Sequence, residues 1–112
     1  MATLFGKIIQ REIPANIVYE DDLCLAFRDI NPQAPTHVLL VPKKEIDMLS
    51  SAQVGDQALL GHLMLAAVKV ARQFGAGDAF RLVVNNGAEA GQSVFHLHLH
   101  ILAGRKLHWP PG

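Results

Sequence analysis

The sequence has few of the features that mark secreted, membrane-spanning or polyanion-binding proteins. Its single cysteine, Cys24, has no partner for an internal disulfide and stands between two leucines, as a buried, inert thiol in a reducing compartment would. Ten basic residues balance ten acidic ones, whereas nucleic-acid-binding proteins usually carry a positive excess. The N-terminus lacks the order of a signal peptide, and the longest uncharged apolar stretch, 58–68, is too short to cross a bilayer. We therefore expect a cytoplasmic protein that binds neither nucleic acid nor a membrane.

Composition indicates a folded chain. Half of the 112 residues are apolar and 18% are charged, so the chain can bury a core without disulfides. This length fits one domain over 1–112, with an irregular tail over 104–112. The mean hydropathy of +0.21 is high for so small a domain, and this predicts that part of the apolar surface lies at a subunit interface.

Turn residues and hydrophobic periodicity divide the chain into elements. The expected elements are a short helix over 4–10, strands over 16–19, 23–28 and 37–41, a long helix over 56–74, and strands over 81–85 and 94–102. Runs of strands broken by one long helix favour an α+β fold with a mostly antiparallel five-stranded sheet.

The long helix is apolar nearly all round. Its main stripe consists of Leu60, Leu63, Met64, Ala67, Ala71 and Phe74. Leu59, Leu65 and Val68 fall outside this stripe. A helix of this kind needs two apolar partners, so we expect one face to cover the sheet and the other to meet a second copy of the helix across a two-fold axis.

Three of the six histidines alternate with apolar residues in the run His96–Ile101 (HLHLHI). Side chains alternate faces along a strand, so the three imidazoles are expected on one face, about 6.6 Å apart, and the apolar side chains on the other. The apolar face should enter the core, and the imidazole face should meet solvent or a ligand. Three aligned rings that titrate near neutrality indicate a functional surface.

Two kinds of chemistry fit this row. In the first, two histidines bind a metal with a third ligand from His37, His62 or Cys24. Zinc needs three or four convergent ligands, and the sequence has no HExxH, no CxxC and no carboxylate beside the row, so we expect no metal and no cofactor, with a metal-site protein kept as an alternative. In the second, a neutral imidazole attacks phosphorus and forms a phosphoimidazole that hydrolyses readily.

The loop before the row supports the second chemistry. Gly87 and Gly91 allow backbone N–H groups to approach an anion closely. Gln92 adds an amide and Ser93 a hydroxyl. A glycine-bearing loop that leads directly into a histidine row is stronger evidence than either feature alone.

The segment 91–102 (GQSVFHLHLHIL) resembles the signature of the histidine triad superfamily, His-φ-His-φ-His-φ-φ with φ apolar, and fits it at every position. The likeness covers nearly the whole chain, including the segments 5–9, 13–15, 19–22, 29–37, 42–44, 60–64 and 83–85. The ending 108–112 (HWPPG) is most similar to the histidine triad nucleotide-binding (Hint) branch rather than to the diadenosine polyphosphate hydrolase or uridylyltransferase branches.

The resemblance implies a homodimeric α+β protein that binds purine mononucleotides such as AMP and hydrolyses nucleoside phosphoramidates without a metal. By motif position, His98 would be the nucleophile that becomes adenylylated. His96 and His100 would contact the phosphate and orient the nucleophile, with His37 behind them. The tail would reach across the dimer interface toward the partner's site.

The resemblance also implies a nucleotide-binding set. Ser93, Gln92, Gly91 and Asn85 would hold the α-phosphate and the leaving group, Asp29 would accept hydrogen bonds from the ribose, and Ile8, Phe27 and Ile30 would lie beside the base. Three of these positions also have structural interpretations. Phe27 and Ile8 fit a core equally well, and Asp29 could be a turn acceptor before Asn31-Pro32.

Two other functions stay open. One is hydrolysis of dinucleoside polyphosphates. The other is a nucleotide-responsive binding protein whose slow hydrolysis is incidental. The loop 86–91 (NGAEAG) is less glycine-rich or acidic than is common in the family, which leaves the leaving-group preference open.

Overall fold

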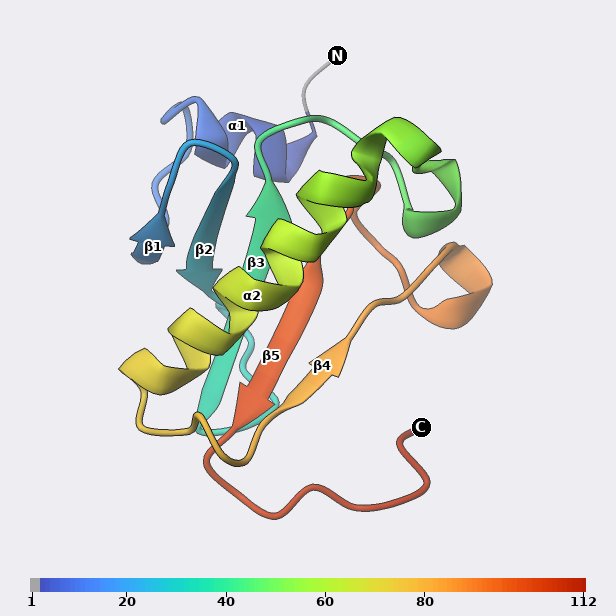
Figure 1. Cartoon of the computed structure of the whole chain (residues 1–112). Coiled ribbons are helices and arrows are strands. Elements are labelled where there is room, and N and C mark those ends of the chain that lie inside the picture. The colour runs from blue at the N-terminus through green and yellow to red at the C-terminus, as the bar shows by residue number, and fades with distance from the viewer. Residues whose placement is uncertain (1–2) are drawn as a thin grey trace.

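A five-stranded antiparallel sheet organises the protein (Figure 1). The computed structural model describes residues 3–112. Its elements are α1 (Leu4–Ile9), β1 (Ile17–Glu20), β2 (Cys24–Arg28), β3 (Thr36–Pro42), α2 (Gln57–Gln73), β4 (Arg81–Val83) and β5 (Leu99–Ala103), with short 3-10 turns at Leu49–Ser51, Val54–Asp56 and Ala88–Ala90. The strand order is β1-β2-β3-β5-β4, and every pairing is antiparallel. The predicted α+β class and sheet are confirmed.

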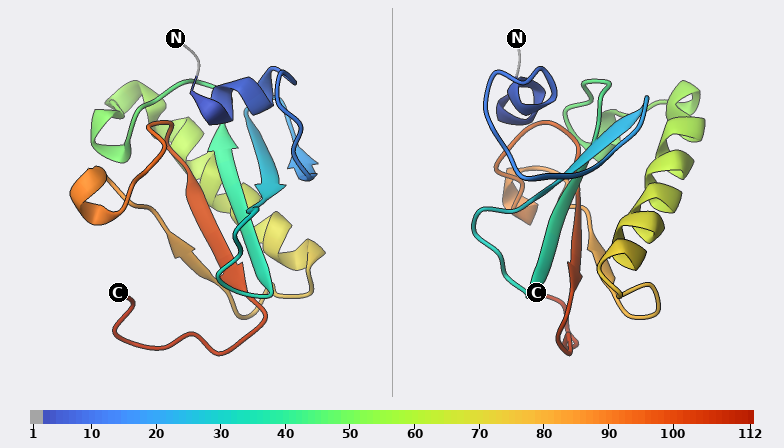
Figure 2. Two further views of the ribbon diagram at one scale, coloured as in Figure 1. Left: turned by 180° about the vertical axis from the view of Figure 1, so that it is seen from behind. Right: turned by 90° about the vertical axis from the view of Figure 1, so that its left-hand side faces the viewer.

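The two helices cover opposite faces of the sheet (Figure 2). The side chains of β3 alternate between them. Val38 and Leu40 pack in the core beneath α2, whereas Leu39 and Val41 pack with Phe5 and Ile8 of α1. β3 is therefore buried on both faces, as its continuous apolar run predicts.

The short helix α1 is held by its cap and by two apolar anchors. The Thr3 hydroxyl oxygen accepts a hydrogen bond from the Gly6 N–H at 3.1 Å, which satisfies one of the free donors at the helix start. Phe5 packs against Phe27 of β2 with ring centroids 5.3 Å apart. A six-residue helix would not form alone, so tertiary packing keeps α1 in place.

The buried face of α2 differs in part from the predicted stripe. Leu63, Ala67 and Ala71 are buried as predicted, and Ala66 and Val70 join them. These five residues follow the i, i+3, i+4, i+7, i+8 spacing of a helix that covers one sheet. Met64, predicted in the stripe, is 53% exposed. Leu59, predicted outside it, packs partly against the core.

The second face of α2 remains apolar and open. Leu65 is 69% exposed, beside Met64. By length and composition alone, the segment Val54–Gln73 would qualify as a membrane span. In the structure this segment instead lies along the sheet and places its small and branched residues in the core.

The two last strands are shorter than predicted. β4 ends at Val83 rather than at Asn85. β5 begins at Leu99 rather than at Val94, because the chain before it forms hydrogen bonds outside the sheet instead of pairing with a neighbouring strand. The Leu97 N–H donates to the Ile46 carbonyl at 2.7 Å, outside the sheet.

The exposed face of α2 leads to a prediction about assembly. Leu65→Asp should shift a wild-type homodimer to monomer or aggregate, because a charge at an apolar interface is costly to desolvate. Sedimentation velocity at micromolar concentration measures the change. The control is Val54→Asp, which alters another exposed apolar side chain, 88% accessible and outside α2. A wild-type protein that sediments as a compact monomer would contradict the expected dimer.

Candidate active site

A cleft of about 290 Å³ lies where α1 faces the ends of β2 and the histidine row. Most of its wall is apolar: Leu4, Phe5, Ile8, Ile13, Pro14, Ala15, Phe27, Ile30, Leu39 and Val94 line it. Its polar lining consists of Arg28, Asp29, Ser93, His98 and His100. A long apolar wall with a few convergent polar groups is typical of a small-molecule site.

One hydrogen bond fixes the tautomer of His98. Its Nδ1 lies 2.8 Å from the carbonyl oxygen of His96. A carbonyl oxygen only accepts, so Nδ1 carries the proton and donates it. In the neutral ring, Nε2 then holds a free lone pair. His98 therefore offers the cleft an unprotonated nitrogen, the form that a nucleophile requires.

A second chain of bonds gives His100 the opposite role. The Gln33 backbone N–H donates to Nδ1 of His37 at 3.0 Å, so His37 is protonated on Nε2. That Nε2–H donates to Nδ1 of His100 at 2.9 Å. His100 consequently carries its proton on Nε2 and is a hydrogen-bond donor. Two adjacent imidazoles, with ring centroids 5.0 Å apart, thus present a lone pair and an N–H.

Burial keeps these rings neutral. Desolvation is the main cause that lowers the pKa of His98 and the pKa of His37. Burial, together with the neighbouring His98 and His37, lowers the pKa of His100 to about 4. The Asp29 carboxylate, 3.4 Å from Nε2 of His37, acts in the opposite direction, but burial outweighs it. All three rings are therefore uncharged at neutral pH.

His96 lies outside the cleft, away from the phosphate contact predicted for it, although its carbonyl oxygen does orient His98. Its ring is 1% exposed and does not line the cleft. Nε2 donates to the Pro42 carbonyl at 2.8 Å, and Nδ1 accepts from the Thr3 hydroxyl at 3.1 Å. His96 does lie on the α1 face with His98, as alternation predicts, since Phe5 contacts both rings. The expectation that this face meets solvent or a ligand is wrong at His96, because α1 covers it.

The loop before the histidine row contains two glycines with a positive φ. Gly87 and Gly91 have φ of +90° and +101°, a region that favours glycine. The Gln92 amide, expected to hold phosphate, is instead 4% exposed. Its oxygen accepts from the Gly87 N–H, and its nitrogen donates to the carbonyls of Asp47 and Val94. Gln92 thus shapes the loop, with no free amide turned to a ligand.

The remaining predicted phosphate ligands divide into two groups. Ser93 lines the cleft beside His98 and His100. Asn85 and Gly91 do not line it; they are close to each other, since a Cβ on Gly91 would lie 3.7 Å from the Asn85 amide nitrogen. Asn85 and Gly91 therefore belong to the outer part of the loop.

The predicted ribose and base positions gather at the cleft. Asp29 lines it, although one carboxylate oxygen accepts from the Asn31 N–H at 2.8 Å, so it also stabilises its turn. Phe27 and Ile8 combine both expected roles, because they are buried core residues that line the cleft. Ile30 is fully exposed at the rim.

Sequence reasoning missed several contributors to this site, among them Arg28 and Phe5 in the cleft wall. Leu39 lines the cleft and pairs with His100; its place two residues after His37 on one strand could have revealed it. Thr3 and the Gln33 backbone hold His96 and His37. No sequence signal marks these two contacts. Thr3 and His96 are 93 positions apart, and the Gln33–His37 contact, four positions apart, depends on loop geometry.

Of the three proposed third metal ligands, His37 lies beside His100 of the row, whereas Cys24 and His62 lie on the α2 side of the sheet. Cys24 packs in the core beneath α2, whereas the histidine row faces α1. His62 lies on α2 and pairs with Asp21. Neither side chain can complete a site with the row. Within residues 3–112, two groups have metal-ligating geometry: Asp29, His37 and His100, and separately Asp21, Cys24 and His62.

Comparisons with known proteins assign the chain. The HIT domain family matches residues 10–107. An uncharacterized HIT-like protein from Synechocystis sp. is 70% identical over 110 residues, covering 98% of this chain and 96% of that protein. The chain belongs to the HIT domain family.

Other relatives extend this assignment to solved structures and to plants. A HIT family hydrolase from Legionella pneumophila has a TM-score of 0.95 at 49% identity, covering 97% of this chain and 98% of the other. A histidine triad protein from Clostridium difficile has a TM-score of 0.89 at 45% identity, with coverages of 94% and 92%. A 14 kDa zinc-binding protein from Zea mays is 49% identical, covering 98% of this chain and 88% of that protein. The family therefore includes hydrolases that share this fold.

The lowered histidine pKa values predict a pH dependence of stability. In the unfolded chain these rings gain protons near pH 6.5, whereas folded His100 remains neutral down to about pH 4. The unfolded state binds more protons in that window, so the free energy of unfolding should fall as pH drops from 6.5 toward 4. Urea unfolding at pH 7 and pH 5 measures the difference.

The difference in the free energy of unfolding between pH 7 and pH 5 should shrink in His100→Asn. It should persist in His108→Asn, which changes an exposed histidine. Equal stability of the wild type at both pH values would contradict the expected neutral, buried rings.

Proposed function

We propose that this HIT protein hydrolyses the P–N bond of purine nucleoside 5′-phosphoramidates through a covalent nucleotidyl-His98 intermediate. The observation that carries the proposal is the pair of complementary tautomers. His98 offers a lone pair on Nε2 and His100 a proton on Nε2, side by side at the polar part of one cleft. Displacement at phosphorus with an amine leaving group uses both, the lone pair for attack and the N–H as a hydrogen-bond donor.

In the first step, His98 Nε2 forms a bond to the α-phosphorus as the P–N bond to the amine breaks. The departing nitrogen takes the electron pair of that bond and a proton from solvent, while the Nε2–H of neutral His100 donates a hydrogen bond at the polar end of the cleft. The attacked ring becomes positively charged, and its Nδ1–H donates to the His96 carbonyl, which stabilises that charge. Burial, together with His98 and His37, lowers the pKa of His100 to about 4, so the ring stays neutral and presents its Nε2–H as a hydrogen-bond donor throughout the step.

In the second step, water attacks the phosphorus and His98 Nε2 departs with the bonding pair. The water proton passes to solvent, and the Nε2–H of His100 stays in place. His37 acts as a positioning residue, because its N–H to Nδ1 of His100 keeps the His100 proton on the cleft side. The sum is one phosphoramidate and one water converted to a nucleoside monophosphate and an amine, with no metal in any step.

The cleft supports a mononucleotide as the bound group. Its volume of about 290 Å³ is at the lower end of small-molecule sites, which fits one nucleotide better than two. The apolar wall, with Phe27 and Ile8, suits a purine ring, and Asp29 suits the ribose hydroxyls. A dinucleoside polyphosphate hydrolase stays the second candidate only through the shared histidine row.

A homodimer completes this proposal. The tail extends past β4 at the edge of the sheet (Figure 1), where the Arg81 side chain donates to the His108 carbonyl at 2.8 Å. Trp109 is 82% exposed, and no tail residue lines the cleft of its own chain. Docking on a partner subunit would give this ring a surface and place the tail near the partner's leaving-group pocket.

His98→Ala should slow hydrolysis of an adenosine phosphoramidate by about 10³- to 10⁶-fold, because the nucleophile is lost. AMP binding should remain measurable, since the apolar wall and Asp29 are unchanged. Single-turnover trapping with labelled substrate should place the adenylyl group on His98 in the wild type. The control is His62→Gln, which alters a histidine outside the cleft.

Turnover at the wild-type rate in His98→Ala would contradict the proposed mechanism. Addition of a chelator should leave wild-type turnover unchanged, and a dinucleoside polyphosphate should be a much poorer substrate. Loss of turnover in chelator would favour a metal-dependent reaction instead.

Deleting 107–112 should change leaving-group preference while His98 chemistry continues. The measurement is kcat/KM for two adenosine phosphoramidates with different amines, for the intact and the truncated protein. Trp109→Ala, which removes only the ring, is the matched variant. An unchanged ratio of the two specificity constants would show that the tail does not shape this pocket.

A further inference from the structure

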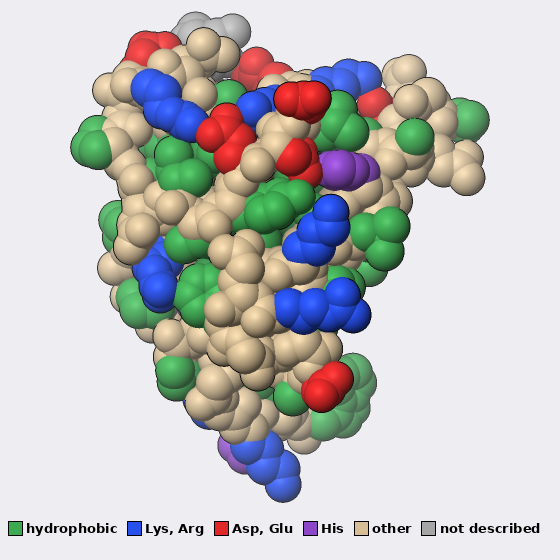
Figure 3. All heavy atoms as spheres, turned by 60° about the vertical axis from the view of Figure 1, so that its left-hand side comes forward, with side chains coloured by type: hydrophobic (Ala, Val, Ile, Leu, Met, Phe, Trp, Pro, Cys, Tyr) green, Lys and Arg blue, Asp and Glu red, His purple; other side chains and the backbone are tan. Residues whose placement is uncertain are grey.

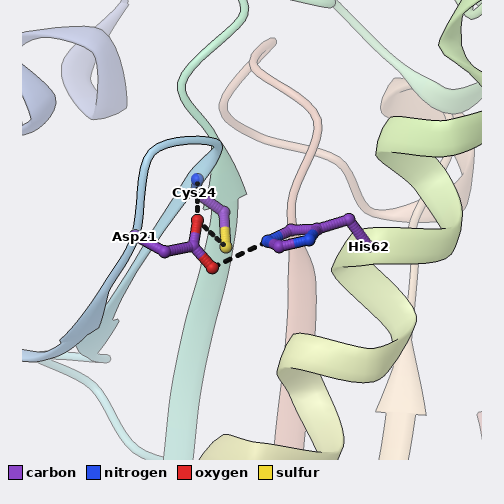
Figure 4. Close-up of side chains that lie close together, drawn as sticks. All are labelled: Asp21, Cys24 and His62. Carbon is purple, nitrogen blue, oxygen red and sulfur yellow. Dashed lines mark hydrogen bonds and ion pairs between the residues drawn. The ribbon is translucent and has the colours of Figure 1, made fainter.

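Three side chains with metal-ligating atoms converge beneath α2, on the face of the sheet opposite the cleft (Figure 4). Asp21 lies in the turn between β1 and β2, Cys24 begins β2, and His62 lies on α2. The Asp21 carboxylate is 2.7 Å from Nε2 of His62 and 3.4 Å from Sγ of Cys24. All three ligand atoms lie within 4.8 Å of one another.

The donor set matches zinc. Thiolate, imidazole and carboxylate are its three protein ligand types, at bond lengths of about 2.0–2.3 Å in a tetrahedron. Such bonds set neighbouring ligand atoms roughly 3.3–3.8 Å apart. Sγ of Cys24 lies 3.4 Å from Oδ1 of Asp21, which falls in this range. Nε2 of His62 lies 2.7 Å from the other carboxylate oxygen, Oδ2, so the carboxylate must turn one oxygen toward the metal as this hydrogen bond opens.

A supporting shell already orients Asp21. The backbone N–H groups of Leu23 and Cys24 donate to one carboxylate oxygen at 2.8 and 2.9 Å. The Tyr19 hydroxyl donates to the other at 2.8 Å. Hydrogen bonds of this kind fix the direction of a ligating carboxylate and are characteristic of metal sites.

The site is closed on the core side and accessible from the surface. Cys24 is fully buried, whereas the side chains of His62 and Asp21 are 33% and 24% exposed. The space-filling view shows a histidine side chain next to acidic side chains, with Lys and Arg side chains close by (Figure 3). A cation can therefore reach the buried sulfur past the imidazole.

We propose that Asp21, Cys24 and His62 form a zinc site, with water as the fourth ligand, that fastens α2 to the turn between β1 and β2. Binding forms a Zn–S bond as the S–H bond breaks and its proton passes to solvent. It replaces the Asp21–His62 hydrogen bond with bonds from both residues to the metal. The His62 ring loses its Nε2 proton to solvent and takes one up on Nδ1, which frees the Nε2 lone pair for zinc. The site shares no residue with the cleft, so it stands independently of the proposed hydrolysis.

Burial, and the hydrogen bond from the thiol to Asp21, raise the pKa of Cys24 to about 12. Zinc lowers the pKa of a coordinated thiol and displaces its proton. Binding near neutral pH should therefore release a proton that the Cys24→Ser variant cannot supply.

Cobalt(II) titration tests the site directly, because Cys24 is the only cysteine in the chain. Co²⁺ should produce a thiolate-to-cobalt charge-transfer band in the near ultraviolet and tetrahedral bands in the visible, at one ion per chain. Zn²⁺ should displace the cobalt and bleach both. The charge-transfer band should be absent in Cys24→Ser, and the affinity should fall at least about 10-fold in His62→Gln, which loses one ligand.

The control is His100→Asn, which removes a ligand atom from the other candidate group, one that contains no sulfur. Its charge-transfer band should equal that of the wild type. Zn²⁺ should also raise the Tm of the wild type but not of His62→Gln. His62 is chosen for this second measurement because its side chain is partly exposed.

Two outcomes would overturn the proposal. The first is saturation with Co²⁺ without a charge-transfer band in folded wild-type protein, which would leave the three residues as a hydrogen-bonded clamp only. The second is Co²⁺ binding that His100→Asn abolishes and His62→Gln leaves unchanged, which would place the metal in the cleft.

Discussion

The hydrogen bond from His98 Nδ1 to the carbonyl of His96 is the constraint on which the cleft depends. It bends the chain before β5, holds the proton on the inner nitrogen and leaves the outer nitrogen free. The His96 ring makes that carbonyl a fixed point, because it is tied to the Pro42 carbonyl on one side and to the Thr3 hydroxyl on the other. The cap of α1, the end of β3 and the nucleophile are thereby one connected structure.

Burial then determines what these imidazoles can do. In water each ring would be partly protonated near pH 6.5, and a protonated His98 has no lone pair for attack. The packing of Phe5 over His98, with ring centroids 4.9 Å apart, helps exclude the water that would stabilise a charged ring. The same desolvation that costs stability at low pH keeps Nε2 of His98 unprotonated at neutral pH.

The sheet separates two chemical environments. On the α1 face, histidines and apolar side chains form the cleft. On the α2 face, the core ends at a polar group of Asp21, Cys24 and His62, and the outer surface of the helix carries Met64 and Leu65. Strand alternation alone sends Cys24 and Leu25 to opposite faces, so neighbouring residues in the sequence pack on different sides of the sheet. This division explains why one small sheet can support a cleft, a candidate metal site and a candidate interface without overlap.

The sequence by itself determined the α+β class, the five strands, the long helix and the common face of His98 and His100, because hydrophobic periodicity and strand alternation are local. It also identified the family through a motif that is contiguous. Tertiary structure alone decided which face of α2 is buried, as Met64 and Leu59 show, and where β5 begins. It turned His96 and Gln92 inward, because α1 and the 87–92 loop offered them partners that lie far away or depend on backbone geometry. It also brought Asp21 to His62 across 41 residues; no spacing in the sequence encodes that contact, since packing of a helix on a sheet creates it.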